Sequence, residues 1–258
     1  MRGKTLFAAL VGGLFCLWLS AEAAQAQNLL TNGNLDKCYA QEIVPGFFLP
    51  KPASWFNTGS RSISGPYEDE MSSEPWAGPA PTPVTTDGDA APPDGVGVGA
   101  DGAVFFKPFS GNATDGLATG SLYQDVPGIA GRNYTLTGWA GAEANALMQD
   151  AVFAVEFLDA AHVEIPASGN ELSLLPNLFT PNGQPFNYKM YTVSATAPAG
   201  TAYVRARASM IGATGNPAGG GQAFVIDDFN LVPEPGSLAV ASFGMLLVAA
   251  RGRRRRTA

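Results

Sequence analysis

Apolar and polar residues alternate with a period of two along most of this chain, and this pattern more than any other limits the folds open to it. The alternation covers the segments 27–35, 103–109, 121–126, 132–140, 151–158, 188–195, 201–211 and 223–232. It is typical of β-strands that bury one face. Clusters of Gly, Pro, Asn and Asp between the segments predict turns. No segment carries a helical stripe, so we expect an all-β fold, a β-sandwich of the jelly-roll type.

The region 40–100 breaks this pattern. It is rich in proline, and we expect long Pro/Gly-rich loops there, with one short strand around Trp55. Partial disorder is one interpretation, and packing onto the sandwich through Trp55, Tyr67 and Trp76 is the other. The acidic stretch 87–101 lacks the spacing of an EF-hand loop, which favours a solvated loop.

Residues 1–26 have the features of a secretory signal peptide. Arg2 and Lys4 precede an apolar run over 6–19, and Ala24-Gln25-Ala26 fits a cleavage site. A membrane anchor is the alternative, but the run is shorter than the ~20 apolar residues that favour a span. We therefore expect export by the general secretory route and a mature chain that begins at Gln27.

The C-terminal segment 232–258 has three parts in a fixed order. Pro233, Glu234 and Pro235 are followed by an apolar run over 237–250 and by an arginine-rich end over 251–256. This order resembles the PEP-CTERM sorting signal. The resemblance implies a hydrophobic transmembrane helix that holds the protein at the inner membrane of a Gram-negative bacterium until an exosortase removes it, leaving the product at the cell surface or in the matrix. A plain tail anchor with a basic stop is the alternative. The predicted β-sandwich domain is then 27–231.

Charge in the body of the chain is strongly negative. Between Gln27 and Pro235 there are eight Lys and Arg against twenty-one Asp and Glu, a net charge of −13, although the whole chain carries −7. An acidic body repels phosphate backbones and argues against nucleic-acid binding. It suits an extracellular protein and can recruit cations.

Four motifs resemble those of galactose-binding-like jelly rolls, the fold of many carbohydrate-binding modules. They are NLLTNGNLD at 28–36, LYQDV at 122–126 with GRNYTLTGW at 131–139, APAGTA at 197–202 and FVIDDFNL at 224–231. Their order along the chain is the one expected of that fold. Leu35 and Asp36 depart from the usual Phe-Glu, and the region 40–100 is longer than expected.

The same resemblance implies a structural calcium ion. In such domains the first and last strands lie near each other and commonly share this ion, which takes six to eight oxygen ligands. Asp36 and Asp227 match the positions that would donate carboxylates. Aspartate is one carbon shorter than the usual glutamate, which would weaken the site. Alternatively, Asp227 and Asp228 only cap or solvate the closing strand.

Strand alternation also predicts a face on which a sugar could bind. If Val204 and its apolar neighbours at period two face the core, then Tyr203, Arg205 and Arg207 face outward. The same argument turns Glu156 and Trp139 outward. Aromatic rings stack on sugar rings, and arginine donors pair with hydroxyls or uronate carboxylates. The alternative is an ordinary exposed sheet face with an Arg–Glu pair and a tryptophan under a loop.

Catalytic motifs are lacking in the sequence. The chain has no Gly-x-Ser-x-Gly, P-loop or His-Glu-x-x-His motif, and its single histidine, His162, falls in a predicted surface turn. We expect a non-catalytic surface or matrix protein that binds or organises extracellular polysaccharide. A structural or adhesive protein without sugar binding is the alternative. A glycoside hydrolase is less favoured, since no carboxylate pair stands out.

Overall fold

The computed structural model describes residues 27–61, 71–76, 102–108, 116–175, 177–178, 188–218 and 222–234. Within these ranges every regular element is a strand. The predicted signal peptide and most of the predicted sorting signal lie outside them. None of the described residues forms a helix long and apolar enough to cross a membrane, and the run 237–250 is not among them.

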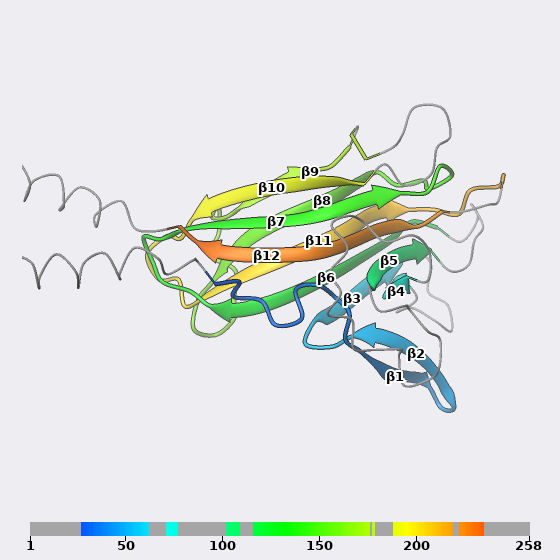
Figure 1. Ribbon diagram of the computed structural model, residues 1–258, viewed down its shortest axis with the longest axis horizontal. Coiled ribbons are helices and arrows are strands. Elements are labelled where there is room, and N and C mark those ends of the chain that lie inside the picture. The colour runs from blue at the N-terminus through cyan, green and yellow to red at the C-terminus, as the bar shows by residue number, and fades with distance from the viewer. Residues whose placement is uncertain are drawn as a thin grey trace, which may run out of the picture.

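Two five-stranded antiparallel sheets form a β-sandwich. The strands are β1 (Cys38–Val44), β2 (Phe47–Pro52), β3 (Phe56–Arg61), β4 (Met71–Trp76), β5 (Ala103–Pro108), β6 (Ala118–Pro127), β7 (Asn133–Ala142), β8 (Asp150–Leu158), β9 (Asn170–Ser173), β10 (Lys189–Thr196), β11 (Tyr203–Ala213) and β12 (Phe224–Pro233). One sheet has the order β10-β7-β12-β5-β4 and the other β3-β6-β11-β8-β9, while β1 and β2 pair as a separate hairpin. Figure 1 shows the hairpin to one side of the two layers. The predicted all-β jelly-roll sandwich is confirmed.

Alternation places the core between the two sheets. Phe153 and Phe157 of β8 are fully buried with Val204 of β11 and Leu136 of β7, as the period-two pattern predicts. Burying one such side chain contributes on the order of 1.5–3 kcal/mol. Glu156 of β8 and Arg205 of β11 alternate with these core residues and point to the outer face, so the core fixes which side chains the sheet presents outward.

The opening segment differs from its prediction. Residues 27–35 form an irregular segment with a turn at 31–34 instead of a strand, and both Asn32 and Leu35 have positive φ, 54° and 57°. The segment nevertheless runs beside β12, where the Leu29 N–H donates to the Leu231 carbonyl at 2.9 Å and the Phe229 N–H donates to the Gly33 carbonyl at 2.7 Å. The expected proximity of the first and last segments is therefore confirmed.

The region 40–100 holds more regular structure than the sequence predicts. β2, β3 and β4 lie within it and β1 begins just before it, and β3 and β4 each form one edge of a five-stranded sheet. Proline is tolerated at sheet edges because no neighbour requires its missing N–H. Proline content is therefore no argument against strands there. Trp55 packs onto the sandwich as expected, with its ring 5.5 Å from that of Phe229 and its indole N–H donating to the Asn32 carbonyl.

The expected contacts of Tyr67 and Trp76 and the acidic stretch 87–101 lie outside the part whose side chains are described. The sequence also missed β9, a four-residue strand with three exposed positions and one half-buried one. A strand this short gives too little alternation to recognise.

Candidate functional site

The outer surface of the sheet β3-β6-β11-β8-β9 carries a continuous group of polar and aromatic side chains, here called the polar face. Its members are Phe56, Tyr123, Asp125, Glu156, His162, Glu171, Tyr203, Arg205 and Arg207. Strand register brings them together, since Asp125 lies opposite Arg205 and Arg205 lies opposite Glu156 on the other side. Four of the five residues predicted for sugar binding, all but Trp139, belong to it.

Aromatic rings occupy the β3 edge of the polar face. Phe56 lies opposite Tyr123 in the register, and the two rings stack with centroids 5.5 Å apart and planes at 23°. The guanidinium carbon of Arg205 lies 4.0 Å from the centroid of the Tyr123 ring, a cation–π contact. Phe56 is 61% exposed. An aromatic surface therefore faces solvent beside a cation.

Asp125 bonds to two other members of the polar face, Arg205 and His162. Its carboxylate accepts hydrogen bonds from Nε of Arg205 at 2.6 Å and from Nη2 at 3.0 Å, and Nδ1 of His162 lies 3.0 Å from Oδ2. Burial opposes ionisation, but the bonds from Arg205 and His162 outweigh it and hold the pKa of the Asp125 carboxyl below its ordinary value. The same pairing raises the pKa of Arg205.

A turn after β8 places His162 over Tyr203. Asp159 shapes this turn, because its side chain accepts hydrogen bonds from the N–H groups of Ala161 and Val163. His162 has a φ of 58° and is exposed, as the sequence predicts for its surface turn. Its ring stacks on Tyr203 with centroids 3.9 Å apart. This forms a second aromatic pair at the other side of Asp125.

Arg207 has all three of its guanidinium nitrogens bonded. Nε donates to Glu156 at 2.7 Å, Nη1 to Ser209 at 2.6 Å and Nη2 to Glu171 at 2.6 Å. Burial lowers the pKa of Arg207, but its bonds to the two glutamates outweigh that effect and raise it. The Arg–Glu pair of the alternative interpretation is thus present. Arg207 has no donor nitrogen without a protein partner, so it acts as a brace between strands β8, β9 and β11.

Trp139 is not on the polar face. It lies in β7 of the opposite sheet, in register with Met190 of β10 and Asp227 of β12, and is half-buried. The expectation that one face holds all five residues is wrong on this point. Alternation gives the side of a strand but not the sheet to which the strand belongs, and β7 and β11 belong to different sheets.

The two residues expected to bind calcium are buried carboxylates. Asp36 is 2% exposed, and its oxygens accept hydrogen bonds from the Gly102 N–H at 2.6 Å and from the amide nitrogen of Asn34. Asp227 is 1% exposed and accepts a bond from the N–H of Asp228. Among the described residues no three His, Cys, Asp or Glu come together in a way that suits a metal. The N–H donors on the Asp36 oxygens occupy lone pairs that a calcium ion would need, and the calcium ion stays a prediction.

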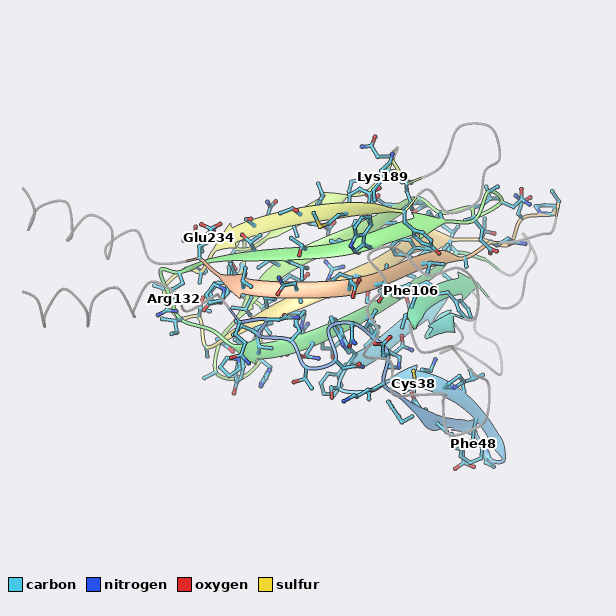
Figure 2. All side chains as sticks on the ribbon, in the orientation of Figure 1. Cys38, Phe48, Phe106, Arg132, Lys189 and Glu234 are labelled. Carbon is cyan, nitrogen blue, oxygen red and sulfur yellow. The ribbon has the colours of Figure 1, made fainter. Side chains whose placement is uncertain are left out.

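Two residues of the predicted sorting motif belong to the folded sandwich. Pro233 ends β12 opposite Tyr134, and the N–H of Glu234 donates to the Asn133 carbonyl at 2.8 Å. The hydroxyl of Thr135 donates to the Glu234 carboxylate at 3.0 Å. Figure 2 shows Glu234 at the same end of the sandwich as Arg132. Pro235 lies outside the described residues.

Comparisons with known proteins give likenesses of shape. No family model and no curated protein matches the chain. One similar solved structure is the enzymatically active domain of bacteriophage CBA120 tailspike protein 4, with 10% sequence identity and a TM-score of 0.47. The match covers 80% of this chain and 21% of the tailspike chain. A second is TmCBM61 in complex with β-1,4-galactotriose, with 17% identity and a TM-score of 0.42; the match covers 81% of this chain and 100% of TmCBM61. A third is a family 16 carbohydrate-binding module, with 16% identity and a TM-score of 0.34; the match covers 52% of this chain and 78% of that module. None of these three TM-scores reaches 0.5, so these likenesses identify no ligand for this chain.

Sequence reasoning missed Phe56, Tyr123, Asp125 and Glu171 on the polar face. Tyr123 and Asp125 alternate with buried Leu122 and Val126, so the same period-two argument would have turned them outward. Phe56 adjoins the short strand predicted around Trp55, but this segment has no apolar alternation that would set the direction of its side chain.

Proposed function

We propose that this chain is an exported, non-catalytic protein that binds extracellular polysaccharide through the polar face. The observation that carries the proposal is the pair formed by Phe56 and Tyr123. A large apolar ring at 61% exposure on a folded strand gains nothing in stability from facing water. Beside the Arg205 cation and polar groups, it suits the alternating apolar and hydroxylated surfaces of a sugar ring.

The state of the carboxylates supports a binding role over hydrolysis. Asp125 and Glu156 each accept a hydrogen bond from an arginine, and the pKa of Asp125 is lowered. A glycosidase needs one carboxylic acid that stays protonated to release the leaving group. An arginine-paired carboxylate with a lowered pKa is poorly suited to that role.

Substitution of the exposed ring tests the proposed face. Phe56→Ala should weaken binding to a polysaccharide that retards the wild type in affinity gels by roughly threefold or more, since an aromatic contact contributes about 0.5–1.5 kcal/mol. Phe48→Ala is the matched control, because Phe48 is 50% exposed but lies in the β1–β2 hairpin (Figure 2). Equal retardation of wild type and Phe56→Ala would exclude this face. If no glycan of a broad panel retards the wild type, the structural or adhesive role stands instead.

Export and processing are part of the proposal and rest on the two ends of the sequence. We propose cleavage before Gln27, transient inner-membrane association and removal of the tail by an exosortase. Mass spectrometry of the protein recovered from cells and medium should give Gln27 as the first residue and a new C-terminus that lies within the predicted sorting signal, 232–258. An uncleaved chain in the cytosol would contradict this part of the proposal.

A further inference from the structure

The polar face carries two aromatic pairs rather than one. Phe56 with Tyr123 forms the first, and Tyr203 with His162 forms the second. Tyr203 lies opposite Pro127, four residues along β6 from Tyr123. At about 3.3 Å per residue, the two pairs are some 13 Å apart along the strands. This separation exceeds the width of one pyranose ring, so a ligand in contact with both pairs needs more than one sugar.

Both arginines of the polar face are already neutralised by protein carboxylates. Arg205 pairs with Asp125, and Arg207 pairs with Glu156 and Glu171, each with a contact of 2.6 Å. Three carboxylates against two guanidinium groups give these side chains a net charge of −1 with His162 neutral. Planar nitrogen donors bind carboxylates best as a two-pronged fork, and here Asp125 already holds the fork of Arg205. A uronate or sulfate group would have to displace a protein carboxylate.

Within the described part of the chain, one donor nitrogen between the aromatic pairs has no acceptor. Arg205 bonds Asp125 through Nε and Nη2, and among the described residues no acceptor bonds its Nη1. The Arg205 side chain is 22% exposed. Nη1 of Arg205 is a charged donor that Asp125 holds in place, but it cannot form a two-pronged pair with a second carboxylate. Such a donor suits a hydroxyl oxygen of an uncharged sugar.

We infer that the polar face binds an uncharged oligosaccharide segment that spans both aromatic pairs, and that it discriminates against acidic polysaccharides. This inference rests on the proposed function. It adds the chemical class of the ligand and its minimum length. The negative charge of the whole body, −13 between Gln27 and Pro235, acts in the same direction over longer range.

Calorimetric titration of the whole exported protein tests the inference. The probes are neutral xylo-, gluco-, manno- and galacto-oligosaccharides of one to six units, and polygalacturonate and alginate as acidic chains. We expect at least one neutral series to bind, with affinity rising at least tenfold between one unit and the length that spans the pairs. We expect the acidic chains to bind at least tenfold more weakly. The inference is overturned if the acidic chains bind more tightly than the neutral oligosaccharides and added salt abolishes that binding. It is also overturned if a neutral monosaccharide and hexasaccharide bind with equal affinity. In either case the proposed polysaccharide binding still stands. Absence of binding to every probe overturns the proposed function itself.

Variants separate the two aromatic pairs. Tyr203→Ala should lower affinity for the longest neutral oligosaccharide by roughly three- to tenfold, and so should Phe56→Ala, because each removes one ring contact. The shorter oligosaccharides should lose affinity in only one of the two variants. Met190→Ala is the control, since Met190 is 59% exposed on the opposite sheet. If Tyr203→Ala binds every length like the wild type, the ligand does not reach the second pair and the inference fails.

Discussion

Gln124 ties the N-terminal turn to the sandwich, and replacing it tests how that turn is held. The side chain is 6% exposed and points from β6 toward the core side. Its oxygen accepts a hydrogen bond from the Thr31 N–H at 2.8 Å, and its nitrogen donates to the carbonyls of Thr31 and Ser54 at 2.9 Å each. One side chain thus joins β6 to the opening turn and to the turn before β3.

In Gln124→Leu these three hydrogen bonds are lost while the side-chain volume is nearly kept. At about 1 kcal/mol for each bond, the free energy of unfolding should fall by about 3 kcal/mol. That is a large share of the 5–15 kcal/mol typical of a domain. Urea denaturation followed by circular dichroism should give a midpoint lower by roughly 1–1.5 M, for an m-value of about 2–3 kcal/mol/M. Hydrogen exchange at the Thr31 amide should become faster than the fall in global stability alone explains.

Gln149→Leu is the matched control, because Gln149 is exposed in the connection between β7 and β8. It makes the same chemical change where no buried hydrogen bond is broken, and it should stay within about 0.5 kcal/mol of the wild type. If Gln124→Leu also stays within that range, or if both variants lose the same amount, Gln124 does not stabilise the turn as argued.

Three further substitutions test other parts of the structure. Gly33→Ala should destabilise the fold by about 1–3 kcal/mol in urea denaturation, because a Cβ there would lie 2.3 Å from the backbone oxygen of Phe229; a wild-type midpoint would refute this contact. Asp125 has a lowered pKa, so its contribution to stability is complete above its unfolded pKa near 3.8 and is lost as the pH falls through its folded pKa. The free energy of unfolding should therefore fall less in Asp125→Asn than in the wild type between pH 4 and pH 2. If it falls equally in both proteins, the pairing of Asp125 with Arg205 and His162 does not stabilise the fold. If calcium is bound, millimolar calcium should raise the Tm of the wild type and not of Asp227→Ala; no rise in the wild type would remove calcium from the account.

The sequence predicted the central strands well because each has a single buried face. Seven of the eight alternating segments correspond to strands, since Phe153, Val204 and their neighbours recur at period two with hydrophobic faces long enough to recognise. The edge strand β4 was missed and β3 was predicted only as a short strand around Trp55, because both contain residues typical of loops and β3 has no buried residue from Phe56 to Ser60. The opening segment was misassigned because its alternation matched a strand, whereas the side chains of Asn28 and Gln124 bond its backbone into a turn.

The binding face was predicted in part for a related reason. The outward direction of Tyr203, Arg205 and Glu156 followed from strand periodicity, which is a local property. The exclusion of Trp139 and the inclusion of Phe56 and His162 depend on sheet order and on the path of two turns, and no local pattern encodes these. The salt bridges from Arg205 to Asp125 and from Arg207 to Glu156 depend on strand register. Only the structure therefore shows that both guanidinium groups are already paired with carboxylates.

The attachment of Glu234 to β7 bears on how the sandwich would respond to mechanical load. β12 lies between β7 and β5, and its end is held to β7 through the Pro233 pairing and the Glu234 bonds to Asn133 and Thr135. A pull applied from beyond Glu234 therefore acts along an inner strand of the sheet. The backbone hydrogen bonds between β12 and its two neighbours would then be loaded in shear and would share the force. In an edge strand that is peeled from a sheet, such bonds break one at a time. A domain tethered through this end would be anchored at one of its most firmly held strands.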